Sequence, residues 1–232
     1  MILKETSEHL HELYGERLKG LSVEKVVVGI FFTGVKLSNG CGGVSYTPTS
    51  DIHDTVCCPS MAAQKPASGS LKGVSAHEIL NEEKETPIFN AIRISVMNAL
   101  SFDVFLAGSG YEIIYDKDLL EIIDLNSIKR ISMVGAFIPF IKRLKRMEGI
   151  ELYVVEKKES SLKNDELRYY VPAERASEVL PISDTVIITG SSIANGTIDE
   201  LLSCVRPGST VAVVGPTASF LPDAFLNGMW GL

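Results

Sequence analysis

Basic charge is in short supply in this sequence, and the motifs of several large enzyme classes are missing. The chain has 22 lysine and arginine residues against 29 acidic residues, a formal net charge of −7. Nucleic-acid binders usually concentrate positive charge, so this balance argues against a nucleic-acid partner. The one basic cluster, 141–146, alternates with apolar residues as a solvated helix face does. The sequence also has no G-x-S-x-G elbow, no P-loop and no H-E-x-x-H motif.

Long apolar runs and a secretion signal are also missing. The longest apolar stretch, Val26–Phe32, is far shorter than the roughly 18 residues that span a bilayer. The first 20 residues are amphipathic and carry several acidic side chains, unlike a signal peptide. We therefore expect a cytoplasmic protein with no membrane partner, whose four cysteines are thiols rather than disulfides.

The second half of the chain alternates between strand-like and helix-like segments. Short runs rich in valine and isoleucine lie at 128–137, 150–158, 185–190 and 209–216, each followed by a helical pattern. This alternation predicts βαβ units and a parallel, Rossmann-like sheet over residues 111–232.

The first half of the chain lacks this alternation, and its pattern predicts a small α+β domain over residues 1–110. Apolar residues at helical spacing predict a helix over 3–19. Two strand-like runs, 23–37 and 42–48, are separated by Asn39-Gly40, which is typical of a hairpin. Thr86-Pro87 then begins a helix that is apolar nearly all round and should therefore be buried.

The ends of the predicted parallel strands carry the candidate ligand-binding residues. Ligands bind beyond the carboxyl ends of strands in such sheets. Glycine at these ends lets the backbone approach a ligand without a Cβ clash. The residues at these ends are Gly135, Phe137, Glu156, Thr189, Gly190, Gly215 and Pro216.

The segment from Gly190 to Gly196 lies before a predicted helix that begins with Thr197 as its cap and Glu200 three residues later. The amide groups at a helix start favour anions, so this loop, with Asn195, is a candidate wall for a carboxylate, phosphate or ribose. Alternatively, the segment is an ordinary turn before a capped helix. The carboxylates of Asp199 and Glu200 already interact with the positive end of the helix dipole, which leaves less of it for a ligand.

Glu156 lies 21 positions after Gly135, a spacing at which Rossmann folds place an acid on ribose hydroxyls. The segment after the first strand has one glycine where the dinucleotide fingerprint has three. The sequence thus argues against NAD and leaves open a nucleoside-type cofactor such as S-adenosylmethionine. Alternatively, Glu156 is a solvated residue at the end of its strand and binds no ligand.

Metal and catalytic candidates lie in the first half. His53, Cys57 and Cys58 are close in sequence and could bind zinc or another transition metal, although no C-x-x-C pair supports a structural zinc site. Thr33 and Lys36 in the hairpin are the catalytic candidates, with a solvated lysine as the alternative reading.

The segments 29–48, 131–137 and 183–223 resemble a family described as putative heavy-metal chelation proteins. The resemblance depends on a combination of motifs: a strand that ends in I-T-G, then Asn-Gly-Thr, then V-x-G-P near the end of the sequence. It implies an enolase-N-terminal-like domain before a Rossmann-like domain with methyltransferase-like features, and a further strand after residue 232. It also implies a site between the domains that draws on Thr33, Lys36, Gly135, Phe137, Glu156, Thr189, Gly190, Asn195, Gly196, Thr197, Gly215 and Pro216.

Three functions follow from these observations. The first is binding, with or without chemical transformation, of a small metal-chelating or heterocyclic molecule such as a pterin, flavin or siderophore. The second is a methyltransferase-like enzyme with a nucleoside cofactor on Glu156. The third is metal binding through His53, Cys57 and Cys58. The sequence does not determine the reaction, the identity of a bound metal, or whether the protein forms a homo-oligomer.

Overall fold

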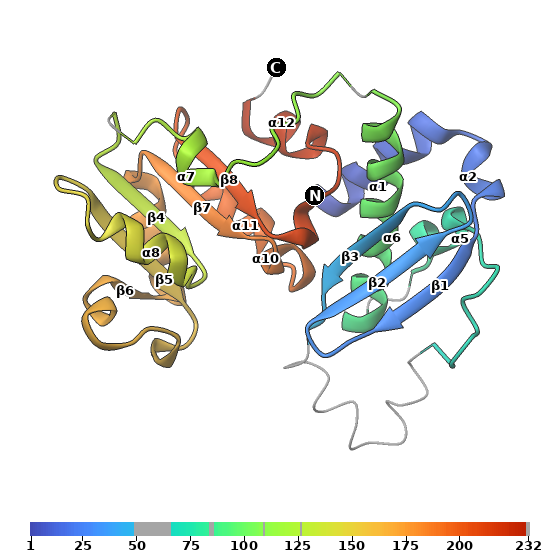
Figure 1. Cartoon of the computed structure of the whole chain (residues 1–232), viewed down its shortest axis with the longest axis horizontal. Helices are drawn as coiled ribbons and strands as arrows, with labels where there is room; N and C mark the ends of the chain where they lie inside the picture. The colour runs from blue at the N-terminus through green and yellow to red at the C-terminus, as the bar shows by residue number, and fades with distance from the viewer. Residues whose placement is uncertain (49–65, 84–85, 109, 126, 231–232) are drawn as a thin grey trace. The chain divides into compact units, whose positions relative to one another are not determined.

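The chain forms two compact units (Figure 1). A computed structural model describes residues 1–48, 66–83, 86–108, 110–125 and 127–230, with side chains up to residue 226. Unit 1 contains Met1–Tyr111, Gly190–Gly196 and Gly215–Leu232, and unit 2 contains Glu112–Thr189 and Thr197–Val214. The predicted domain boundary at residue 110 stays a prediction. In the structure, two later segments, 190–196 and 215–232, pack with unit 1.

Unit 1 contains a three-stranded antiparallel sheet in the order β1-β2-β3. The strands are β1 (Val23–Val28), β2 (Phe32–Leu37) and β3 (Gly42–Tyr46). Gly40, with φ of 88°, lies in the predicted hairpin turn between β2 and β3. The run predicted as one strand over 23–37 is instead two strands joined by a turn. That turn contains Ile30 and Phe31, which are 74% and 72% exposed. Because both residues are apolar, the sequence gives no sign of a turn at this point.

The helix predicted over 3–19 is two helices, α1 (Ile2–Tyr14) and α2 (Arg17–Gly20). The break comes at Gly15, whose φ of 51° ends α1. A short helix, α5 (Ala76–Asn81), starts with a capping box in which Ser75 and Glu78 bond reciprocally.

The buried helix predicted after Thr86 is α6 (Pro87–Leu106), and it forms the core of unit 1. The Thr86 side chain accepts a hydrogen bond from the Phe89 amide and Pro87 occupies the first turn, as the sequence predicts. The helix lies so close to β3 that a Cβ on Gly43 would be 2.2 Å from the Ser95 carbonyl oxygen. Although α6 is long and apolar enough to cross a membrane, 61% of its most apolar window is buried inside the protein, as in a core helix.

Unit 2 is built on a parallel sheet whose strand order is β6-β5-β4-β7-β8. The strands are β4 (Arg130–Val134), β5 (Glu151–Glu156), β6 (Tyr170–Pro172), β7 (Thr185–Thr189) and β8 (Thr210–Val214). All neighbouring pairs are parallel, which confirms the predicted Rossmann-like sheet. The first strand of the unit, β4, is central, and the chain turns outward in both directions from it. The short strand β6 is not predicted by the sequence.

Short helices cover this sheet and connect its strands. In unit 2 these are α7 (Leu119–Ile122), α8 (Ile138–Leu144), α9 (Ala176–Val179) and α11 (Ile198–Ser203). Ile141 and Leu144 of α8 pack with Ile131 and Met133 of β4 in a buried apolar cluster. Short 3₁₀ turns lie at Glu159–Ser161, Asn164–Tyr169, Ala173–Arg175 and Leu180–Ile182, so the segment with a helical sequence pattern that follows β5 is only partly α-helical.

Two segments that follow strands of unit 2 belong to unit 1. The predicted loop 190–196 contains a helical turn, α10 (Ser191–Ala194), with Ile193 fully buried. The last strand is followed by a 3₁₀ turn (Pro216–Ala218) and helix α12 (Asp223–Trp230). Thr197 precedes α11 as predicted, but its side chain makes no capping hydrogen bond there, so the predicted capping box is wrong.

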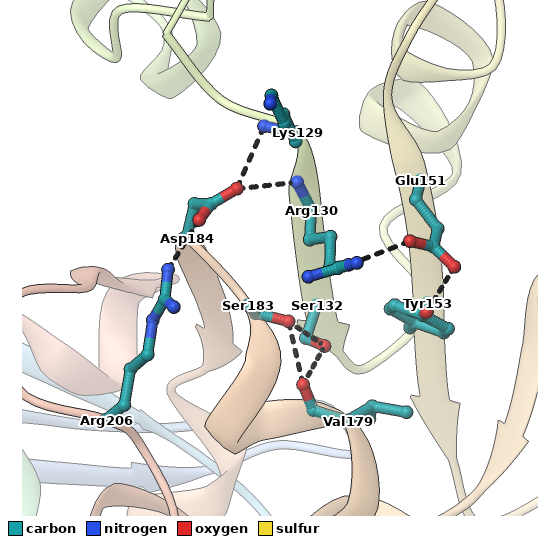
Figure 2. A network of polar contacts seen from close by, with 9 residues as sticks. All are labelled: Lys129, Arg130, Ser132, Glu151, Tyr153, Val179, Ser183, Asp184 and Arg206. Atoms are coloured by element: carbon teal, nitrogen blue, oxygen red, sulfur yellow. Dashed lines mark hydrogen bonds and ion pairs between the residues drawn. The ribbon is translucent and has the colours of Figure 1, made fainter.

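The amino ends of β4 and β7 are joined by a polar network (Figure 2). Asp184, just before β7, accepts hydrogen bonds from the backbone amides of Lys129 and Arg130 at 2.9 and 2.8 Å. Arg206 pairs with its other carboxylate oxygen. Ser132 and Ser183 share a hydrogen bond of 2.7 Å, and Ser183 also donates to the Val179 carbonyl oxygen. These groups satisfy one another and hold β4 and β7 together.

Candidate functional site

The carboxyl ends of β4 and β5 bring together Gly135 and Glu156. The Gly135 amide donates to the Val155 carbonyl oxygen at 2.9 Å, which continues the pairing of the two strands into the turn. The Ala136 amide then donates to Oε2 of Glu156 at 3.2 Å. Gly135 has φ of +95°, a conformation in which a Cβ is strained, so this turn favours glycine.

The end of β7 completes this part of the site. A Cβ built on Gly135 would lie 3.1 Å from the Thr189 Cβ and Cγ2 atoms, so the two strand ends are in close contact. Phe137 follows, with its Cε2 atom 3.7 Å from the same position, and its ring lies 5.7 Å from that of Phe140. The fold therefore brings Gly135, Phe137, Glu156 and Thr189 to one edge of one sheet. We call these four residues the strand-end cluster.

The Glu156 carboxylate keeps hydrogen-bonding capacity at this edge. Its Oε1 atom accepts from the Lys157 amide at 2.8 Å, and Oε2 accepts from Ala136. A carboxylate has about four acceptor positions, and these two bonds use two of them. The side chain is partly exposed. It is thus oriented by the backbone and still able to accept hydrogen bonds from a ligand.

The remaining predicted ligand residues are divided between the two units. Thr197 lies in unit 2, whereas Gly190, Asn195, Gly196, Gly215 and Pro216 lie in unit 1. A ligand site shared by both halves of the chain accordingly stays a prediction.

A polar residue in the apolar helix α6, Asn98, holds the segment after β8. Asn98 of α6 is 3% exposed, and its amide nitrogen donates to the carbonyl oxygens of Val44, Pro216 and Thr217 at 2.7, 3.1 and 3.1 Å. Thr217 Oγ1 accepts from the Tyr46 amide at 2.9 Å. Both contacts lie within unit 1 and fix the turn that begins at Gly215. The sequence hints at these contacts only by placing an asparagine in an otherwise apolar helix.

Thr33 and Lys36 point to opposite faces of the unit 1 sheet. The Thr33 hydroxyl is buried and lies 2.9 Å from that of Thr47, while its carbonyl oxygen accepts from Ser95. The Lys36 ammonium forms an ion pair of 2.8 Å with Glu24 on the exposed face. The structure does not bring these two catalytic candidates together.

The candidate metal ligands His53, Cys57 and Cys58 lie outside the described residues. Within the part of the chain that is described, no three or more histidine, cysteine or acidic side chains gather as metal ligands would. Cys41 and Cys204 are thiols, as predicted. Burial raises the pKa of the Cys41 thiol, with Asp103 adding to the effect, so it is a poor nucleophile.

Comparisons with known proteins match two successive parts of the chain. Residues 11–101 and 118–228 match two family models that share one description, putative heavy-metal chelation. The chain belongs to this family. An uncharacterized protein of Methanocaldococcus jannaschii is 33% identical over 114 residues, which cover 47% of this chain and 41% of that protein. The chain thus spans less than half the length of that relative.

Two solved structures of the same family share the fold. A Pyrococcus horikoshii protein of unknown function aligns with a TM-score of 0.71 and 23% identity, covering 97% of this chain and 82% of that one. A Desulfitobacterium hafniense protein of unknown function aligns with a TM-score of 0.66 and 18% identity, covering 96% and 84%. These similarities confirm the α/β architecture.

Proposed function

We propose that this protein binds a small metal-chelating or heterocyclic molecule at the strand-end cluster of unit 2. The observation that carries the proposal is the position of Glu156 and Gly135 on adjacent strands, beside the point where the strand order reverses between β4 and β7. Open parallel sheets bind ligands at that point. The family description supports a ligand connected with heavy metals.

The chemistry of the cluster favours a ligand with neighbouring hydroxyl or N–H donors. The two remaining acceptor positions of Glu156 suit two such donors, as in a catechol-type chelator or the edge of a pterin or flavin. Hydrogen bonds to a charged acceptor contribute about 1.5–3 kcal/mol each, enough for Glu156 to dominate recognition. Phe137, next to Gly135, offers an aromatic ring for a planar ligand.

The proposal is tested by ligand screening followed by titration. A thermal-shift panel of pterins, flavins and catechol or hydroxamate chelators, each with and without Fe³⁺, should identify a stabilising compound. Calorimetric titration of that compound is then repeated with Glu156→Gln. Because one charged hydrogen bond is lost, we expect affinity to fall at least about tenfold.

Glu151→Gln is the matched control, since Glu151 begins the same strand at the opposite end of the sheet. That variant should bind the compound as the wild type does. The proposal would be abandoned if Glu156→Gln kept full affinity, or if both variants lost it equally.

A second candidate, a nucleoside-type cofactor, is favoured by the same Glu156 position at the end of the second strand of a Rossmann-type sheet. S-adenosylmethionine and adenosine should then bind, and 2′,3′-dideoxyadenosine should not, because it lacks the ribose hydroxyls. Equal binding of adenosine and its dideoxy analogue would count against this candidate.

A further inference from the structure

Two histidines from different helices of unit 1 lie in contact away from the strand-end cluster. His11 is on α1 and His77 is in the first turn of α5. Their ring centroids are 5.4 Å apart with the ring planes at 73°. Both side chains are partly exposed, so an ion from solution can reach them. The capping box of Ser75 and Glu78 fixes the helical turn that carries His77.

The hydrogen bonds of His11 determine which ring nitrogen carries its proton. Its Nδ1 atom is 2.8 Å from the Ser7 carbonyl oxygen, which can only accept, so Nδ1 bears the hydrogen. The neutral ring therefore has its lone pair on Nε2. Metal-binding histidines are typically held in this way, with the second nitrogen donating to a carbonyl group.

The Nε2 lone pair of His11 points toward α5. It accepts a hydrogen bond of 3.0 Å from the Asn81 side-chain amide, which also donates to the His77 carbonyl oxygen at 2.8 Å. The second contact fixes the orientation of the amide, because a reversed amide would place its oxygen against the carbonyl oxygen. The Asn81 amide thus hydrogen-bonds to the Nε2 lone pair of His11, and a metal ion can replace this neutral donor.

We propose that His11 and His77 form an open, two-imidazole binding site for a divalent transition metal ion such as Zn²⁺, Ni²⁺ or Cu²⁺. Nε2 of His11 supplies one ligand and a ring nitrogen of His77 supplies the other. Metal–nitrogen bonds of about 2.0–2.1 Å bring two ligating rings to roughly the separation seen here. Imidazole suits these ions, and water completes their coordination. The ion replaces one Asn81 hydrogen bond and leaves the other in place.

Carboxylates near the pair add negative charge to its surroundings. The pKa of Glu16 is lowered, first by its hydrogen bond to Lys19 and to a smaller extent by His77. Glu78 is bonded to Ser75, which is the main reason that its pKa is also lowered. The site that we assign rests on the two imidazoles.

Titration of the untagged full-length chain with Zn²⁺ and Cu²⁺ tests this site. Cys57→Ser and Cys58→Ser are introduced throughout to remove two competing thiols. One ion per chain should bind, and His11→Gln and His77→Gln should each weaken binding at least tenfold. His9→Gln is the matched control on the same helix, where His9 lies 3.5 Å from Asp223 instead. This control should bind as the parent does.

Electron paramagnetic resonance of the Cu²⁺ complex provides a readout that does not depend on affinity. The parent should show two imidazole nitrogens, and His11→Gln or His77→Gln at most one. Asn81→Ala keeps both rings and should bind at least as tightly as the parent. The proposal is overturned if either glutamine variant binds like the parent, if His9→Gln weakens binding equally, or if Asn81→Ala abolishes it. Equal unfolding midpoints in chelator establish that the variants are folded.

Discussion

The two ends of the parallel sheet in unit 2 use their carboxylates differently. At the amino ends, Asp184 accepts from two backbone amides and also pairs with Arg206 (Figure 2). At the carboxyl ends, Glu156 accepts from two backbone amides, and among the described residues no ion pair involves it. Both acids are oriented by the backbone, but only Asp184 also has a cationic partner.

This difference separates a residue that stabilises the sheet from one that can bind a ligand. A carboxylate that is held by backbone amides and also paired with a fixed cation stabilises the fold, and less of its hydrogen-bonding capacity remains for a ligand. One with unused acceptor positions at the ligand-binding end of a sheet is suited to recognition. Four predictions test the comparison, from the largest expected change in stability to the smallest.

Asp184→Ala should be the most destabilising of these changes. It removes a charged acceptor from the amides of Lys129 and Arg130 and leaves Arg206 without its partner. We expect a loss of about 2–3 kcal/mol in the free energy of unfolding, measured by urea denaturation. Glu178→Ala removes an exposed carboxylate that pairs with Arg175, and its loss should be clearly smaller because solvent screens the pair. Equal losses in the two variants would refute the role given to Asp184.

Gly135→Ala should come next, because it combines two separate effects. The φ of +95° strains any residue with a Cβ, and the new Cβ would lie 3.1 Å from Thr189. We expect a loss of about 1–2 kcal/mol. Gly149→Ala is the matched control, with φ of +82° and nothing within 4 Å of the new Cβ. The difference between the two unfolding free energies isolates the contact with Thr189, and no difference would mean that the strand ends are not tightly packed.

The third prediction concerns pH and accounts for part of the Asp184 effect. The pKa of Asp184 is lowered by the hydrogen bonds from the Arg130 and Lys129 amides, with Arg206 adding to them. Because the folded pKa lies below the unfolded value of about 3.9, the ionised group stabilises the fold above that pH. This contribution is lost as the pH falls through the folded pKa. The stability difference between wild type and Asp184→Asn should therefore shrink as the pH is lowered below about 4. A constant difference would contradict the prediction.

The local features that the sequence predicts correctly are those set by nearest neighbours along the chain. Alternating apolar runs predict β4, β5, β7 and β8, and Thr86-Pro87 predicts the start of α6. Because parallel strands place their carboxyl ends along one edge of a sheet, the order of strands and helices along the chain is enough to group Gly135, Glu156 and Thr189.

The features that the sequence does not predict depend on contacts between distant segments. The turn at Ile30 and Phe31 interrupts an apolar run without a polar signal, because its side chains stay exposed. Asn98 resembles an ordinary polar exception in α6 until the segment at Pro216 packs against it. The pairing of His11 with His77 joins helices that are far apart in sequence. Neither composition nor periodicity contains this information.

Glu156→Gln should change stability least while changing ligand binding most. Glutamine keeps the length of the side chain and one carbonyl oxygen, so it can retain one of the two backbone hydrogen bonds. The partner that it loses can reach water at this partly exposed edge, so we expect a cost of less than about 1 kcal/mol. Urea denaturation beside the calorimetric titration measures both quantities on the same protein. A loss as large as that of Asp184→Ala would make Glu156 a stabilising residue, and the contrast between the two ends of the sheet would no longer hold.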